Sequence, residues 1–227
     1  VKCCHVTCRA ALDQAVKQGL ILKNPVDACK TPTLRPKEMQ VLSPEEIRRL
    51  LIQARENDCY ELLLLELSTG LRRGEICALR WEDFDTKQET LHVRRTLHKE
   101  KGKPLTTGDT KTYAGTRKIV LPPSTAQLLR ERKKPAPTEW IFPNPFDPEH
   151  PIAPGTAYNR LKVLLKEAGL PDIRFHDLRH TFATHALSSG VDAKTLAGIL
   201  GHTKASFTLD TYTHTTGAVS YTHLTLP

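Results

Sequence analysis

The sequence predicts a mainly α fold with a small antiparallel β-sheet or hairpin on one side, and three observations lead to this fold class. Ser43 opens a Ser-Pro-Glu-Glu run, the pattern of a helix N-terminus with a capping box. Gly190 and Gly201 follow apolar runs of helical spacing, where helix C-caps favour glycine. The β-prone runs 90–97 and 116–121 are short, so we expect strands to be a minor part of the domain.

Helical periodicity and helix-ending residues divide the rest of the chain into elements. Residues 60–68 are apolar over most of a helix surface, so we expect this helix at the centre of the core. Residues 135–154 are rich in proline and predict an irregular connection. Further helices are expected at 6–22, 43–54, within 69–85, at 122–134, 156–168, 177–188 and 192–200, and around residue 212.

The composition is typical of a globular protein, and the net charge favours binding to a polyanion. Of the 227 residues, 39% are hydrophobic and 26% are charged, and the formal net charge is +8. Such an excess favours nucleic acid or an anionic membrane surface as the partner. No apolar run approaches the roughly 20 residues that a membrane helix requires. We therefore expect a cytoplasmic protein that binds nucleic acid and has no membrane partner.

Cysteines cluster near the N-terminus, followed by a basic segment. Cys3, Cys4, His5 and Cys8 stand close together, but no second ligand pair follows at the spacing of a zinc finger. We therefore expect reduced cysteines that are buried on a helix, and no metal. Residues 30–42 combine two prolines with basic side chains, which is the composition of an extended linker.

A chemically rich stretch runs from His176 to Tyr212. It contains the runs H-D-L-R-H-T-F-A-T-H, L-G-H and L-D-T-Y-T-H, and so offers an arginine, candidate imidazoles and a phenol. These side chains can break and remake a phosphodiester without a metal. His176 and Arg179 are three residues apart at a helix start, so they point the same way. His202 follows Gly201 at a helix end, where the helix dipole favours the protonated imidazole.

Six polar positions stand in a distinctive order along the chain: Arg72 in T-G-L-R-x-x-E, Lys111 in T-K-T, His176 and Arg179, His202 in L-G-H, and Tyr212. In this order they resemble the tyrosine recombinases, especially the integrases of phages and conjugative transposons. The resemblance extends over about residues 42–214. It implies the catalytic-domain fold of that family and a DNA strand-transferase that requires no cofactor, metal or ATP.

The resemblance assigns two arginines to the phosphate. In-line attack on phosphorus adds negative charge to the non-bridging oxygens, so Arg72 and Arg179 are expected to clamp these oxygens bidentately. Glu75 is expected to orient Arg72 and brace the turn. Arg73 remains a rival for the role of Arg72, and by itself the Arg-Arg pair also fits a solvated helix start.

The remaining roles also follow from the resemblance. Tyr212 would be the nucleophile, and His176 would take the phenolic proton. His202 would donate to the phosphate, and Lys111 would protonate the departing 5′ oxygen. The product would be a 3′-phosphotyrosyl link. His180 matches no catalytic position of the family and is expected to be structural.

Basic residues crowd the region between the two β-prone runs. From 94 to 118 the chain has eight Lys/Arg against two acids, which suits a hairpin that lies along DNA phosphates. The candidate DNA contacts are Arg73, Arg94, Arg95, Lys99, Lys101, Lys103, Arg117 and Lys118.

The resemblance further implies domains and partners. Residues 1–29 would end a DNA-clamping core-binding domain, 30–42 would be the linker and 43–218 the catalytic domain. A homotetramer would act on double-stranded DNA at paired attachment sites, integrating or excising a mobile element at the nucleoid of a bacterial or phage-infected host. Accessory directionality or bending factors would assist it. Two alternatives stay open: a type IB topoisomerase, which uses a similar residue set as a monomer, and a catalytically silent DNA-binding module.

The C-terminal residues depart from the family. Residues 219–227, V-S-Y-T-H-L-T-L-P, resemble a translated transposase-end adaptor of the kind used in sequencing libraries. We expect this tail to be non-native and the chain to be a fragment, with a natural polar tail as the alternative. Tyr221 would then imitate Tyr212 without sharing its role.

Overall fold

A computed structural model describes residues 2–32, 39–99, 102, 104–109, 115–134, 138–202 and 208. The chain forms two compact units, Val1–Glu38 and Met39–Pro227. The tail 219–227, Lys101, Lys103, Lys111 and Tyr212 lie outside the described residues. No helix among those described is long and apolar enough to cross a bilayer.

The N-terminal unit contains α1 (Lys2–Lys17) and the short 3-10 helix η1 (Pro25–Ala28). Asn24 joins them, because its side chain donates to Arg9 O and to Asp13 Oδ1 and accepts from the backbone of η1. The expectation of buried cysteines on this helix is wrong: Cys3, Cys4 and Cys8 are exposed. A single helix and turn supply no apolar layer that would cover them.

The larger unit begins with α2 (Pro44–Glu56), whose capping box forms as predicted. Ser43 Oγ accepts from Glu46 N at 3.3 Å, and Glu46 Oε2 accepts from Ser43 N at 2.8 Å. The next helix, α3 (Tyr60–Thr69), is the centre of the core and packs against α2, α5 (Pro123–Lys133) and α7 (Phe175–Ser188). This confirms the expectation for the apolar run 60–68.

Gly70 ends α3 with φ of 59°, a left-handed conformation that glycine adopts without strain. A Cβ atom at this position would lie 2.4 Å from Phe182 of α7. The chain then turns at once into α4 (Arg73–Cys77) and the 3-10 helix η2 (Trp81–Asp83). A Cβ at Gly74 would lie 2.7 Å from Leu97 O, so glycine permits α4 to pack on the neighbouring strand.

Within the described residues, the strands form three small antiparallel sheets. One has the order β1-β2-β5, formed by Phe84–Asp85, Thr90–Val93 and Arg117–Val120. A second pairs β3 (Arg95–His98) with β4 (Thr106–Asp109), and a third pairs β6 (Pro143–Asn144) with β7 (Asp147–Pro151). The predicted run 90–97 is therefore divided at Arg94 between two sheets. The region 135–154, predicted to be irregular, contains the β6–β7 hairpin.

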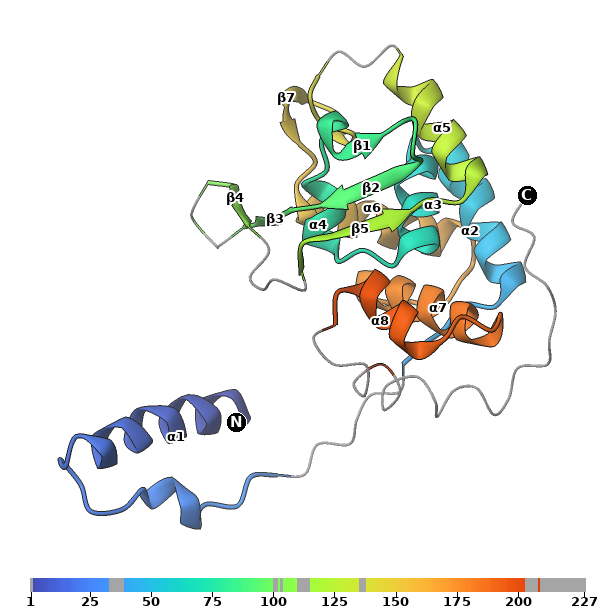
Figure 1. The fold of residues 1–227 in the computed structure, drawn as a ribbon. Coiled ribbons are helices and arrows are strands. Elements are labelled where there is room, and N and C mark those ends of the chain that lie inside the picture. The colour runs from blue at the N-terminus through green and yellow to red at the C-terminus, as the bar shows by residue number, and fades with distance from the viewer. Residues whose placement is uncertain are drawn as a thin grey trace. The chain divides into compact units, whose positions relative to one another are not determined.

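Helices cover one face of the three-stranded sheet, and the β3–β4 hairpin extends away from the sheet (Figure 1). The remaining helices are α6 (Pro154–Glu167) and α8 (Ala193–Leu200), and α8 packs against both α7 and β5. The fold is thus mainly α with small antiparallel sheets, which confirms the predicted class. Its arrangement brings together the start of α4, the strand β5, the start of α7 and the end of α8.

Candidate active site

The start of α4 presents Arg72, braced by Glu75. Glu75 Oε1 accepts from Arg72 Nη1 at 2.8 Å, and Oε2 accepts from Arg72 N at 3.0 Å. The Glu75 side chain is 3% exposed, whereas that of Arg72 is 44% exposed. The i, i+3 spacing seen in the sequence therefore produces one buried carboxylate and one arginine that faces solvent.

Arg117 of β5 is the second partner of Glu75. Its Nη2 lies 2.9 Å from Glu75 Oε2, and its Nε donates to Ile199 O at 2.5 Å. Burial alone would raise the pKa of Glu75, but hydrogen bonds from Arg117 and Arg72 hold it below its ordinary value. Arg117 was expected on an open DNA-binding arm; instead its side chain is 7% exposed and belongs to this buried cluster.

Arg179 lies between α3 and α8. It is 1% exposed; its Nη1 donates to Gly70 O and its Nη2 to Leu200 O, both at 2.7 Å. Its Nη2 also lies 2.8 Å from His202 Nε2. The guanidinium therefore connects the end of α3 to the turn that carries His202.

Three arginines from three elements meet the end of α8. Consecutive carbonyls of this last turn accept from Arg117 (Ile199 O), Arg179 (Leu200 O) and Arg72 (Gly201 O). The last carbonyls of a helix have no partner within it and carry the negative end of its dipole. Guanidinium groups supply both hydrogen-bond donors and positive charge. The three arginines therefore form one cluster at the end of α8.

His202 occupies one protonation state in this cluster. Arginine has only donors, so His202 Nε2 must accept from Arg179, and the proton lies on Nδ1, which donates to Thr208 Oγ1 at 2.8 Å. Burial and the charges of Arg179 and Arg72 lower the pKa of His202 to about 4. The expectation that the helix dipole would favour the protonated ring is wrong, because burial and the neighbouring guanidinium groups oppose protonation.

His176 and His180 make an edge-to-face contact at the start of α7, with ring centroids 4.6 Å apart and an interplanar angle of 80°. Partial burial and the nearby Arg179 lower the pKa of His176. Burial and His176 lower the pKa of His180 to about 4. His176 is exposed and His180 is buried, so His176 is the imidazole that solvent or a substrate can reach.

Glu66 is a buried carboxyl that the sequence reasoning missed. It lies on α3, is 0% exposed, and neither carboxyl oxygen has a hydrogen-bond partner among the residues that the structure describes. Burial raises its pKa well above the ordinary value, although the charge of Arg179 opposes this. The signal was present in the sequence, since Glu66 is an acid inside the apolar run L-L-L-L-E-L.

An exposed basic surface borders the cluster. A cleft of about 530 Å³ is lined in part by Arg72, Arg73 and Lys99. A second, of about 440 Å³, is lined in part by Arg73, Arg174 and His176. Arg73 borders both clefts, and its guanidinium lies 5.8 Å from the ring centroid of Tyr158 rather than within the Glu75 cluster.

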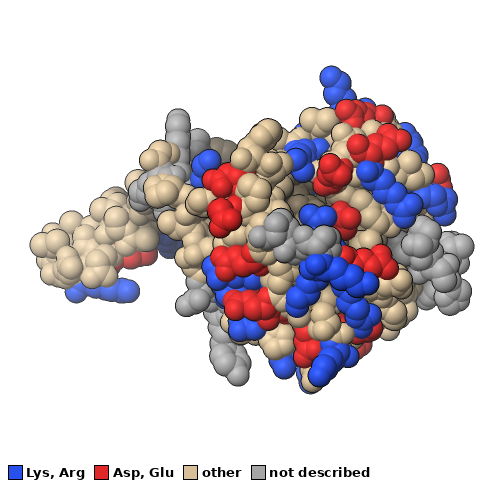
Figure 2. Space-filling view, turned by 90° about the horizontal axis from the view of Figure 1, so that it is seen from above, with Lys and Arg blue, Asp and Glu red and all other residues tan. Residues whose placement is uncertain are grey.

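The other DNA-contact candidates differ in their contacts: two arginines pair with acids, and one lysine is exposed. Arg94 and Arg95 both pair with the buried Asp83, and Arg95 also pairs with Glu82. Lys118 is exposed. On the face seen from above, basic and acidic side chains are interspersed, so the net positive charge is not gathered there (Figure 2).

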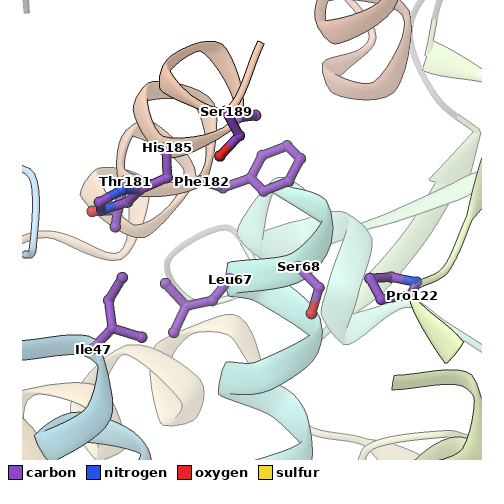
Figure 3. Close-up of a pocket in the computed structure, with 9 residues that line it drawn as sticks. Ile47, Leu67, Ser68, Pro122, Thr181, Phe182, His185 and Ser189 are labelled. Atoms are coloured by element: carbon purple, nitrogen blue, oxygen red, sulfur yellow. The ribbon is translucent and has the colours of Figure 1, made fainter. Parts of the chain in front are cut away.

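A separate apolar pocket of about 180 Å³ lies between α2, α3 and α7. Ile47, Leu67 and Phe182 face it from these three helices (Figure 3). No Lys or Arg lines it, so it does not suit a phosphate. Across the described ranges, no group of three His, Cys, Asp or Glu could hold a metal ion.

Comparisons with known proteins identify the family of this chain. The model of the phage integrase family matches residues 40–218. A XerC-like tyrosine recombinase from Caldanaerobacter subterraneus is 31% identical over 88% of this chain and 58% of that protein. The chain thus spans little more than half of the length of this curated relative.

Solved structures share the fold. The Tn1549 transposon integrase in complex with a circular intermediate DNA has a TM-score of 0.78 at 23% identity, covering 90% of this chain and 71% of that one. A lambda integrase tetramer bound to a Holliday junction has a TM-score of 0.64 at 22% identity, covering 89% and 58%. With the family model matching most of its residues, the chain belongs to the phage integrase family of tyrosine recombinases.

Proposed function

We propose that the whole protein is a site-specific DNA recombinase that cleaves and rejoins strands through a 3′-phosphotyrosyl intermediate, to integrate or excise a mobile element. The observation that carries the proposal is the convergence of Arg72, Arg179, His176 and His202 beside exposed basic clefts. A phosphodiester in this surface would meet Arg72 and His176 directly, and would reach the buried Arg179 by displacing its bond to His202.

The arginines would stabilise the charge that develops on phosphorus oxygens. Arg72 is well placed to turn onto a phosphate because its side chain is 44% exposed while Glu75 holds its backbone N–H. A phosphate oxygen near Arg179 would compete with His202 Nε2 for the same guanidinium group. His202 could then donate to the phosphate only after its proton moves to Nε2, which the negative charge of the phosphate favours.

Tyr212 is the proposed nucleophile and Lys111 the proposed acid for the leaving 5′ oxygen. His176 is exposed, and its lowered pKa keeps it neutral at pH 7, so it is able to accept the phenolic proton. The phosphotyrosyl link conserves the bond energy of the phosphodiester, and rejoining therefore needs no ATP. Arg73, Lys99 and Lys118 are proposed to contact phosphates along the strand.

The partners are also part of the proposal. We place the enzyme on double-stranded attachment sites as a homotetramer, in the nucleoid of a bacterial or phage-infected cell, with accessory factors that set direction or bend DNA. The matched structures are of DNA-bound integrases, one of them a tetramer. We also propose that residues 1–29 belong to a DNA-clamping domain, 30–42 to a linker, 43–218 to the catalytic domain and 219–227 to a non-native tail.

The test is covalent capture. The full-length protein is incubated in EDTA with supercoiled plasmid carrying the DNA that flanks its gene, and SDS-stable protein–DNA adducts are measured. We expect adducts with the wild type and none with Tyr212→Phe. Adducts that persist in Tyr212→Phe would refute the nucleophile assignment.

A type IB topoisomerase would give a different result. It would relax any supercoiled plasmid as a monomer, whereas the recombinase requires its attachment sites in pairs. The absence of adducts from the wild type on every DNA, with binding intact, would instead support a silent DNA-binding module.

A further inference from the structure

We propose that Arg117 is a positioning residue that holds Arg72 and the turn before His202 in their working geometry, and that it does not contact DNA. This inference rests on the proposed strand-transfer function. It follows from the burial of Arg117, from its sharing of Glu75 with Arg72, and from its contact with the end of α8.

Burial separates Arg117 from its neighbour on the strand. Successive residues of a strand point to opposite faces. On β5, Arg117 and Ile119 point inward, with 7% and 3% exposure, while Lys118 and Val120 are exposed. A DNA phosphate would therefore meet Lys118 and not Arg117.

The shared carboxylate couples Arg117 to Arg72. Each Glu75 oxygen accepts from both arginines: Oε1 from Arg72 Nη1 and Arg117 Nη1, and Oε2 from Arg72 N and Arg117 Nη2. With four donors the carboxylate cannot rotate without losing bonds. Arg117 thus fixes the plane of Glu75, and Glu75 fixes the start of α4 that presents Arg72.

A further hydrogen bond joins Arg117 to the turn that carries His202. Arg117 Nε donates to Ile199 O, three residues before the imidazole. Arg72 also holds this turn, through Gly201 O at 3.2 Å, but it is partly exposed and is needed at the phosphate. When Arg72 turns to DNA, Arg117 remains on the helix end, because its partners Glu75, Ile199 O and Gly115 O all belong to the protein.

Loss of this support should slow the chemistry more than it weakens binding. Misplacing a reacting group by about 1 Å costs roughly 10²-fold in rate. Arg117→Gln removes the charge and the bridge between Glu75 and Ile199. Arg117→Lys keeps the charge but cannot reach both partners with one ammonium group. Lys118→Gln is the matched control on the exposed face of the same strand.

The experiment uses the full-length protein and DNA carrying its attachment site. DNA binding is measured against salt, and the adduct rate is measured at saturating DNA. We expect Arg117→Gln and Arg117→Lys to bind with an unchanged salt slope and to form adducts roughly 10²-fold more slowly. Lys118→Gln should lower the salt slope by about one, which is the effect of a lost phosphate contact.

A second readout needs no DNA. The His202 ring is titrated by NMR, with His202→Gln identifying its signals. The charge of Arg117 helps to keep the His202 pKa low, so Arg117→Gln should raise it, whereas Lys118→Gln should not. Thermal unfolding identifies the folded variants, and if Arg117→Gln does not fold, the adduct rate of Arg117→Lys tests the proposal.

The outcomes separate this inference from the proposed function. If the wild type forms no adduct, the recombinase proposal fails, while the His202 titration still tests the position of Arg117. An unmoved His202 pKa in folded Arg117→Gln would overturn the positioning role. A lowered salt slope with an unchanged saturated rate in both Arg117 variants would overturn it as well and assign Arg117 to DNA contact.

Discussion

The start of α4 and the middle of α3 each bury one carboxyl group, and their surroundings are opposite. Glu75 accepts from Arg72 and Arg117, which lower its pKa. Glu66 is at least as deeply buried but has no hydrogen-bond partner in the described part of the chain, and its pKa is raised. Burial is therefore common to both groups, and the partners decide which of them keeps its charge.

The difference also separates structure from chemistry. The charge of Glu75 neutralises part of a three-arginine cluster and orders it, whereas the raised pKa of Glu66 favours a carboxyl that does not cancel the charge of Arg179. Substitutions that reverse either condition test this contrast.

The largest effect is expected from Glu75→Ala. It leaves Arg117 buried without its carboxylate and Arg72 without its brace, and breaking a buried pair in this way costs about 3–5 kcal/mol. Urea unfolding monitored by circular dichroism would measure the loss. An exposed control, Glu56→Ala, should change stability by less than about 0.5 kcal/mol. A loss as small in Glu75→Ala would contradict the account of the cluster.

A double-mutant cycle sharpens the comparison. Glu75→Gln and Arg117→Gln remove two charges in direct contact, so their unfolding free energies should be non-additive by about 0.5–3 kcal/mol. The parallel cycle of Glu66→Gln with Arg117→Gln should give a much smaller coupling, since no hydrogen bond joins Glu66 to Arg117 among the bonds described. Equal coupling in the two cycles would show that the two carboxyls are not distinct.

Glu66→Gln should become favourable as the pH rises. The folded pKa of Glu66 lies above its unfolded value, so its stabilising contribution is complete below the unfolded pKa of about 4.3 and is lost as pH rises toward the folded pKa. Near pH 8 we expect the Tm of Glu66→Gln to exceed the Tm of the wild type by about 2–4 °C. A change of about 1 kcal/mol in unfolding free energy produces this shift in a domain of this size.

The measurement is Tm of both proteins from pH 4 to pH 9. The difference should be near zero at the acidic end and grow with pH. A difference that stays constant across this range would mean that Glu66 keeps the same protonation state in the folded and unfolded chain.

The smallest effect on stability is expected from His202→Asn. The folded pKa of His202 is about 4, below the ordinary value of 6.5, so its contribution is present above about pH 6.5 and is lost as pH falls through 4. Solvent screens the half-exposed ring, which limits the change. Thermal unfolding between pH 6.5 and 4 should show a shallower loss in His202→Asn than in the wild type. An identical loss in both would argue against a lowered His202 pKa.

Much of the local structure could be predicted from the sequence. The capping box at Ser43, the buried helix 60–68 and the C-cap at Gly201 all depend on neighbouring residues, and these expectations agree with the fold. The division of 90–97 into two strands and the β6–β7 hairpin could not, because strand pairing depends on partners far away in the chain.

The order of motifs along the chain was enough to indicate the family and the proposed set of catalytic side chains, and the i, i+3 spacing indicated the contact of Glu75 with Arg72. The protonation of His202 and the place of Arg117 were decided by tertiary structure alone. Arg117 meets Glu75 and Ile199 across separations of 42 and 82 residues. Whether a basic side chain faces DNA or a buried carboxylate depends on the face of the strand and on what packs there, and only the folded chain determines both.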